Sequence, residues 1–113
     1  MSTRGGRAGE VRAGVDASRA FRALGDRKRL RVLQLLGSGE RCVCELAVVI
    51  GAKQPLLSFH LKTLREAGLV VATRRGRWIY YRLNEDALSE LGGFFDELGD
   101  GRVSVAINAG EDE

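Results

Sequence analysis

The sequence has few of the side chains on which disulfide-stapled domains and histidine metal sites depend. Among 113 residues there are two cysteines and one histidine. The cysteines, Cys42 and Cys44, are separated by one residue, whereas a disulfide framework needs several bridges between distant segments. The lone His60 has no second imidazole with which to build a metal site. Another role is therefore required for the two thiols.

Long apolar runs are also missing. No stretch approaches the roughly 18 apolar residues of a membrane span, and the first ten residues lack the apolar run of a signal peptide. We therefore expect a cytoplasmic chain that does not enter a membrane. Catalytic constellations are absent too: there is no plausible nucleophile triad and no glycine-rich phosphate loop between a strand and a helix. We expect one domain with a modest core, and no enzyme.

The charge is unevenly distributed along the chain. The net charge is +3, but residues 53–82 hold seven Lys and Arg against one Glu, a balance of +6. Residues 84–113 hold nine acids against one Arg, a balance of −8. The ordinary interpretation of such runs of charged residues is that they form a solvent-exposed surface. A basic stripe also supplies the sequence-independent part of nucleic-acid binding, and this stripe coincides with the two elements described next.

Residues Lys53–Leu69 are typical of one amphipathic helix. Leu57, Leu61 and Leu64 recur at i, i+4 and i+7, which places them on one inward face. Pro55 suits the first turn, where its missing N–H is not needed. The other faces carry Lys53, Gln54, Ser58, Phe59 and Lys62. A packed core has no use for such side chains, so we interpret the segment as a DNA recognition helix, with an ordinary surface helix as the alternative.

A β-hairpin is predicted directly after this helix. Residues 69–74 and 77–83 are rich in β-branched and aromatic residues and are joined at Arg75-Gly76. The arginines near its tip are Arg74, Arg75 and Arg77. A basic helix followed by such a hairpin is typical of a winged helix-turn-helix, in which the helix enters the major groove and the wing contacts flanking DNA.

The remaining pattern predicts four more helices, over residues 16–24, 27–36 and 41–50 and after Asn84. The segment 27–36 is apolar on more than one side and should be central, and 41–50 should form the helix-turn-helix pair with the recognition helix. We divide the chain into a disordered basic arm (1–14), a DNA-binding and dimerisation domain (15–98) and a flexible acidic tail (99–113).

A dimer is predicted from the last helix. Its apolar side chains Leu88, Leu91, Phe95 and Leu98 repeat at the alternating spacing of a heptad seam. We assign them, with Phe21 of the first helix, to a two-fold interface. A two-fold dimer also suits a palindromic site read by two recognition helices one turn of DNA apart.

Four sequence blocks together resemble the ArsR-type metal-sensing repressors. They are Ala23-Leu24-Gly25-Asp26 with residues 29–33, Cys42-Val43-Cys44-Glu45-Leu46, residues 54–70, and Gly76-Arg77-Trp78 with residues 81–83. The resemblance spans about residues 16–98. It implies a mainly α, dimeric winged helix-turn-helix of about five helices and one two-stranded hairpin, with the terminal helices at the interface. The implied activity is repression of a resistance or efflux operon, relieved by an inducer.

The resemblance also implies that Cys42 and Cys44 are the sensing thiols. The implied inducer is arsenite (As(III)) or a related thiophilic ion, with no constitutive cofactor. Many arsenite-responsive members carry a third cysteine where this chain has Ala47, so one subunit cannot supply three thiolates. Leu56 and Phe59 also stand where such members often have polar or basic residues. The last helix lacks the His and Asp pattern of the zinc-responsive branch.

Cysteine chemistry leads to a mechanistic expectation. Thiolates favour thiophilic ions, and a helix N-terminus lowers a thiol's pKa. If residues 41–50 are helical, Cys42 and Cys44 point to different sides, so binding one ion through both sulfurs should unwind the first turn. The alternative is that both are small, partly buried hydrophobes.

Three functions remain open from the sequence. The first is a repressor of double-stranded operator DNA released by arsenite or a similar ion. The second is the same repressor with a thiol redox switch, which ranks lower because a Cys-x-Cys ring is tight. The third is a winged-helix protein-interaction module, or a thiol carrier, that binds no DNA.

Overall fold

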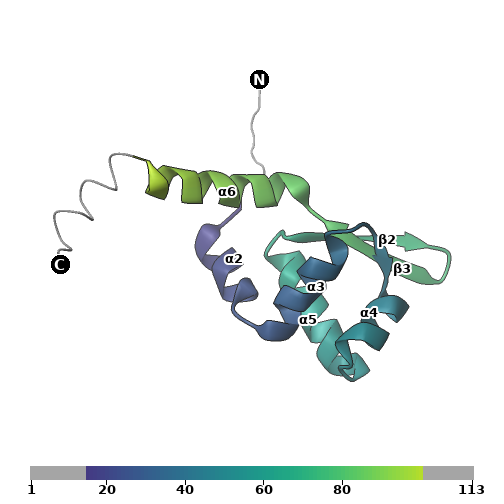
Figure 1. Cartoon of the computed structure of the whole chain (residues 1–113). Helices are drawn as coiled ribbons and strands as arrows, with labels where there is room; N and C mark the ends of the chain where they lie inside the picture. Colours follow the sequence, from purple (N-terminus) through teal and green to yellow (C-terminus); the bar gives the residue numbers. More distant parts are fainter. Residues whose placement is uncertain (1–14, 101–113) are drawn as a thin grey trace.

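The computed structural model describes residues 15–100 and places helices around a small antiparallel sheet (Figure 1). The elements are α2 (Ala17–Leu24), α3 (Arg27–Leu36), β1 (Arg41–Cys42), α4 (Val43–Ile50), α5 (Gln54–Glu66), β2 (Val70–Arg75), β3 (Trp78–Leu83) and α6 (Glu85–Gly99). The winged helix-turn-helix prediction is confirmed. The predicted basic arm and all but the first two residues of the predicted tail lie outside the described residues. Within residues 15–100 no helix is long and apolar enough to cross a membrane.

Short polar side chains fix where the helices begin. The carboxylate of Asp26 accepts hydrogen bonds from the backbone N–H groups of Lys28 and Arg29, and Asn84 does the same for Ala87. Such caps satisfy N–H groups that have no partner inside the helix and contribute about 1 kcal/mol each. After α5 the chain turns at Gly68, whose φ of 81° is disfavoured for residues with a side chain.

The core lies between the middle helices and the sheet. α3 packs against α2, α4, α5 and β3, which confirms its predicted central place. The three leucines predicted on the inner face of α5 are 1%, 3% and 0% exposed at Leu57, Leu61 and Leu64. Each fully buried leucine contributes roughly 1.5–3 kcal/mol relative to an exposed one. α5 is therefore anchored by one face, which leaves its opposite face accessible.

The hairpin is a two-stranded wing extended by a third strand. β2 pairs with β3 in antiparallel register from Val70↔Leu83 to Arg75↔Trp78, with Gly76 at φ 63° in the turn. β1 then pairs with the other edge of β3, giving the order β1-β3-β2. The sequence predicted the hairpin and missed β1, because a two-residue strand has no periodicity to detect.

The predicted helix 41–50 begins two residues later than expected. Cys42 has an extended backbone (φ −69°, ψ 147°) and caps α4 from outside the helix. Its Sγ accepts from Cys44 N at 3.1 Å, and its N–H donates to Glu45 Oε1 at 2.9 Å. This reciprocal capping box ends β1 and starts α4 at Val43. Cysteine is not among the usual capping residues, so the sequence pattern did not reveal the boundary.

Candidate nucleic-acid interface and thiol site

The exposed face of α5 presents the side chains predicted to read DNA. Gln54, Ser58 and Lys62 follow one another at four-residue intervals and are all exposed. Lys53 lies just before the helix as its N-cap residue, and the ring of Phe59 is 57% exposed. The structure therefore brings all five predicted residues of this helix to its accessible side. Lys62 Nζ lies 3.9 Å from Glu66 Oε2, an exposed pair whose contribution is small.

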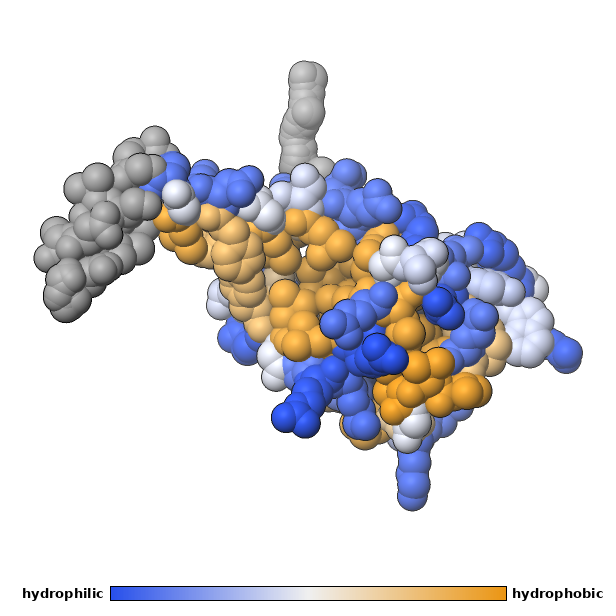
Figure 2. Space-filling model, in the orientation of Figure 1, coloured by the Kyte–Doolittle hydropathy of each residue, from blue (hydrophilic) through white to orange (hydrophobic). Residues whose placement is uncertain are grey.

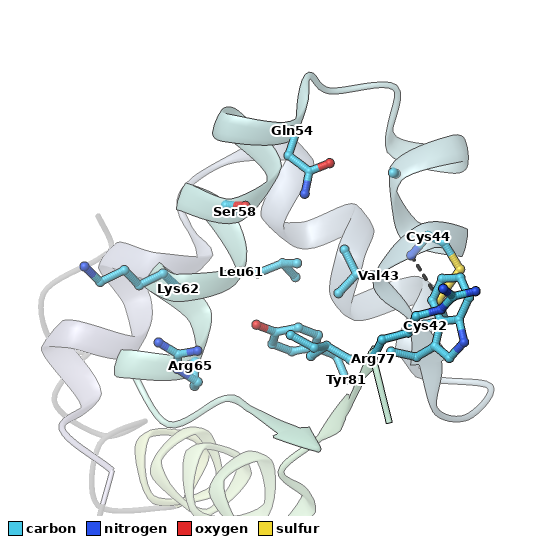
Figure 3. A pocket seen from close by; sticks show the side chains of 13 residues that line it. Cys42, Val43, Cys44, Gln54, Ser58, Leu61, Lys62, Arg65, Arg77 and Tyr81 are labelled. Atoms are coloured by element: carbon cyan, nitrogen blue, oxygen red, sulfur yellow. Dashed lines mark hydrogen bonds between the residues drawn. A yellow bond between two sulfur atoms is a disulfide. The ribbon is translucent and has the colours of Figure 1, made fainter. Parts of the chain in front are cut away.

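A cleft of about 550 Å³ opens between α5, the start of α4 and β3 (Figure 3). Gln54, Ser58 and Lys62 line it from α5, and Figure 3 shows Cys42, Cys44 and Arg77 grouped across the opening. Arg65, which the sequence analysis did not single out, is a third lining cation with Lys62 and Arg77. No acidic side chain is among the described residues that line the cleft. Its electrostatic character is therefore cationic.

The three wing arginines have different surroundings. The guanidinium of Arg75 is held by Glu40, with Nη1–Oε1 and Nη2–Oε2 distances of 2.6 and 3.1 Å, and stacks 4.7 Å from the ring centre of Tyr80. Arg77 lies 5.3 Å from the centre of the Trp78 ring and has no carboxylate within ion-pair distance among the described residues. Arg74 is exposed at the tip. Arg77 and Arg74 are therefore more available to a phosphate than Arg75.

The two cysteines meet at the junction of β1 and α4. Cys42 is 6% exposed, Cys44 is exposed, and their sulfurs are joined in a disulfide across a Cα–Cα distance of 5.2 Å. The small ring of a Cys-x-Cys disulfide can therefore form with the backbone conformation seen here. The expectation that the sulfurs can converge only if the helix unwinds is wrong, because Cys42 precedes α4 in an extended conformation.

The described residues supply no complete metal site of their own. Over residues 15–100 no group of three or more His, Cys, Asp and Glu side chains is placed to hold a metal ion. Ala47, the position of the missing cysteine, lines the same cleft as Cys42 and Cys44. An ion bound to both sulfurs would need any further ligand from outside this set. The volume of the cleft limits the size of that ligand, and its cationic lining favours a negatively charged one.

His60 is turned into the protein rather than toward the cleft. It is 4% exposed, and Arg29 Nη1 lies 3.0 Å from its Nδ1. Since a guanidinium only donates, Nδ1 accepts and the neutral ring carries its proton on Nε2, 3.9 Å from Asp26 Oδ1. Burial lowers the pKa of His60; the charges of Arg29 and Lys28 act in the same direction, and Asp26 opposes them. His60 therefore packs within the protein and does not line the cleft.

The residues assigned to the dimer interface divide into two groups. Leu91 is 6% exposed and packs in the chain's own core, with Leu88 partly buried beside it. Phe95 and Leu98 are 55% and 44% exposed. The ring of Phe21 on α2 lies 5.5 Å from that of Phe95 and 5.7 Å from that of Phe94, which the heptad pattern missed. Figure 2 shows apolar surface along α6 where it faces α2.

Comparison with known proteins shows that this chain is similar to bacterial transcriptional regulators. The family model "Bacterial regulatory protein, arsR family" matches residues 26–71. The arsenic resistance transcriptional regulator ArsR1 of Pseudomonas putida is 39% identical over 87 residues, covering 76% of this chain and 68% of that protein. The arsenical resistance operon repressor of Bacillus subtilis is 40% identical over 72 residues, covering 63% and 69%.

A solved structure gives the same result. The solution structure of the homodimeric winged helix-turn-helix DNA-binding domain of Mb0332 from Mycobacterium bovis, a possible ArsR-family transcriptional regulator, superposes with a TM-score of 0.60 at 35% identity. The match covers 73% of this chain and 79% of that one. These comparisons confirm the resemblance seen in the sequence, and the similar proteins are transcriptional regulators rather than enzymes.

Proposed function

Because this chain belongs to the arsR family of bacterial regulatory proteins, we propose that it is a homodimeric repressor of a resistance or efflux operon. It binds double-stranded operator DNA and is released when arsenite or a similar thiophilic ion binds Cys42 and Cys44. The observation that carries this proposal is the shared cleft: both cysteines line the same opening as the exposed face of α5 and strand β3 of the wing. An ion at the sulfurs acts within the DNA-facing surface itself.

The assignment of DNA contacts follows from exposure and charge. α5 enters the major groove, where Gln54 and Ser58 reach base edges and Phe59 meets thymine methyl groups. Lys53 and Lys62 contact phosphates near the groove. On the wing, Arg74 and Arg77 contact flanking phosphates, whereas Arg75 holds the wing against Glu40 and adds little direct contact.

The route from the thiols to the DNA surface runs through Cys42. This residue pairs with Tyr80 of β3 and also caps α4, the helix that precedes α5. Ion binding redirects the Cys42 sulfur, which then no longer accepts from the Cys44 N–H. The wing and the helix-turn-helix share this residue, so one event shifts both. Moving the population from mostly bound to mostly released requires about 5.5 kcal/mol of differential affinity.

Dimerisation rests on the outer part of the α2–α6 surface. Phe94, Phe95 and Leu98 are exposed apolar side chains of α6, and the partly buried Phe21 of α2 contacts both phenylalanine rings. Exposed clusters of this kind commonly mark protein interfaces. The homodimeric state of the Mycobacterium bovis domain supports self-association of this chain. A two-fold pair then places two copies of α5 on successive turns of a palindromic site.

The test is release of a labelled operator duplex, followed by fluorescence anisotropy. The duplex is the intergenic DNA upstream of the gene, and the protein is first reduced with a phosphine so that the disulfide is open. Arsenite should release the wild type. Cys42→Ser and Cys44→Ser should each bind DNA as the wild type does and fail to respond, while Gln34→Ser, an exposed change on α3, should respond normally.

Three further measurements separate the alternatives. X-ray absorption at the arsenic edge should find about two sulfur neighbours per arsenic when no other thiol is present. Release by peroxide without any ion, together with no release by arsenite, would establish the redox switch instead. Absence of salt-sensitive duplex binding would overturn the repressor assignment and leave the protein-interaction module.

A further inference from the structure

The cleft beside the two sulfurs is larger and more cationic than a bare ion requires. Its volume of about 550 Å³ lies within the range of small-molecule sites. Lys62, Arg65 and Arg77 line it, and among the described residues that line the cleft none is acidic; the exposed Glu66 outside the lining lies 3.9 Å from Lys62 Nζ. A trivalent ion on two sulfurs lacks one ligand. The nearby carboxylate of Glu45 already accepts from the Cys42 N–H, and no group of three His, Cys, Asp and Glu side chains among the described residues is placed to hold a metal ion. The missing ligand and the three cations therefore belong to one cleft, with Arg77 on the side of the sulfurs and Lys62 and Arg65 across the opening (Figure 3).

We propose that this cleft binds the ion together with an anionic low-molecular-mass thiol, an inference that rests on the proposed function. The small molecule's sulfur supplies the third bond to arsenic, and its carboxylates pair with Lys62, Arg65 and Arg77. Each exposed ion pair between a carboxylate and one of these cations is weak. Once the As–S bond has attached the small thiol to the protein, the ion pairs form within one complex and gain from a high effective concentration. A neutral or cationic thiol can supply the same sulfur and lacks the charge complementarity.

The chemistry balances with thiols as the only co-reactants. Two molecules of the small thiol first reduce the Cys42–Cys44 disulfide and leave as their own disulfide. Arsenous acid then loses its three hydroxyl groups as water: two protons come from the protein thiols and one from a third molecule of the small thiol. Three As–S bonds form and three As–O bonds break. No change in the oxidation state of arsenic is needed.

Occupancy of this site competes directly with DNA. Lys62 and Arg77 are two of the cations assigned above to phosphates, and the ligand's carboxylates would neutralise both. The inducer would therefore remove part of the electrostatic attraction to DNA as well as redirect the Cys42 sulfur. An anionic thiol should lower the arsenite concentration needed for release, whereas the thiol without arsenite should have little effect on DNA binding.

The test compares three probe thiols that differ in charge. Mercaptosuccinate carries two carboxylates, 2-mercaptoethanol is neutral, and cysteamine is cationic. Arsenite is titrated into phosphine-reduced protein at a fixed concentration of each thiol, and fluorescence is read from Trp78, the single tryptophan of the chain, which lines the cleft. The apparent Kd for arsenite should be about tenfold lower with mercaptosuccinate than with 2-mercaptoethanol, and highest with cysteamine.

Variants separate this inference from the function on which it rests. Arg65→Gln should reduce the preference for mercaptosuccinate, and Arg31→Gln, an exposed change on α3 outside the cleft lining, should retain it. Native mass spectrometry should detect one arsenic and one mercaptosuccinate per subunit. Ala47→Cys supplies a sulfur from within the cleft and should bind arsenite equally well with all three thiols.

The outcomes are distinct. Equal Kd values for the three thiols in the wild type, or the order reversed, would overturn the anionic-thiol site while leaving arsenite-driven release intact. Retention of the full preference by Arg65→Gln would remove the assigned charge contacts. Failure of both the wild type and Ala47→Cys to bind arsenite with any thiol would overturn the proposed function itself.

Discussion

The contrast between two wing arginines leads to a quantitative prediction for DNA binding. Arg77→Ala removes a cation that has no carboxylate partner among the described residues. Each phosphate contact contributes about 0.9 to the slope of log K against log salt. A dimer loses two such contacts, so the magnitude of the slope should fall by about 1.8. Between about 50 and 200 mM salt, the affinity of the variant should therefore decrease about tenfold less than that of the wild type.

The matched control removes an ion pair, so that the net charge of the wing region does not change. Arg75→Ala combined with Glu40→Ala deletes two groups that already neutralise each other, so the slope should stay near that of the wild type. Anisotropy with a labelled operator and with an unrelated duplex, each at four salt concentrations, measures both slopes. A slope unchanged in Arg77→Ala, or lowered equally in the paired variant, would refute the distinction between the two arginines.

Further predictions concern assembly, capping and pH. Phe95→Glu should yield folded monomers in sedimentation velocity, whereas Leu91→Glu, at a position 6% exposed, should lower the melting temperature as well. Glu45→Ala removes the acceptor for the Cys42 N–H and should cost about 1 kcal/mol in chemical denaturation. The pKa of His60 is lower in the folded state than its usual value, so the unfolded chain binds the proton first as pH falls. Stability should therefore decrease below about pH 6.5, and less so in His60→Gln; equal pH profiles would contradict this.

The sequence determined most of the helices, the wing and the exposed side of α5 that we assign to DNA. Leucines at helical spacing, a proline in the first turn and a glycine after the end specify α5 through local chemistry, and the structure reproduces that pattern at Leu57, Leu61 and Leu64. The β-rich runs around Gly76 likewise specify the hairpin. These features depend on neighbours within a few residues, which is the range over which periodicity and turn propensity act.

Contacts between distant segments were decided only by the tertiary structure. The pairing of Glu40 with Arg75 joins residues 35 positions apart, and the pairing of Cys42 with Tyr80 joins β1 to the wing. No local pattern encodes either contact. The inward turn of His60 toward Arg29 is similarly set by how α3 packs on α5.

The thiol site shows the same division. The sequence determined that two cysteines stand one residue apart with no third, and the chemistry of thiolates then indicates a thiophilic ion. Whether both sulfurs reach one side depends on where α4 begins, and that boundary is set by the capping box and by the pairing of β1 with β3. The cationic cleft arises because α5 and β3 converge on the same opening. Residues at positions 42, 62 and 77 line one cleft only when the chain folds, because packing rather than sequence proximity brings side chains from separate elements to a shared surface.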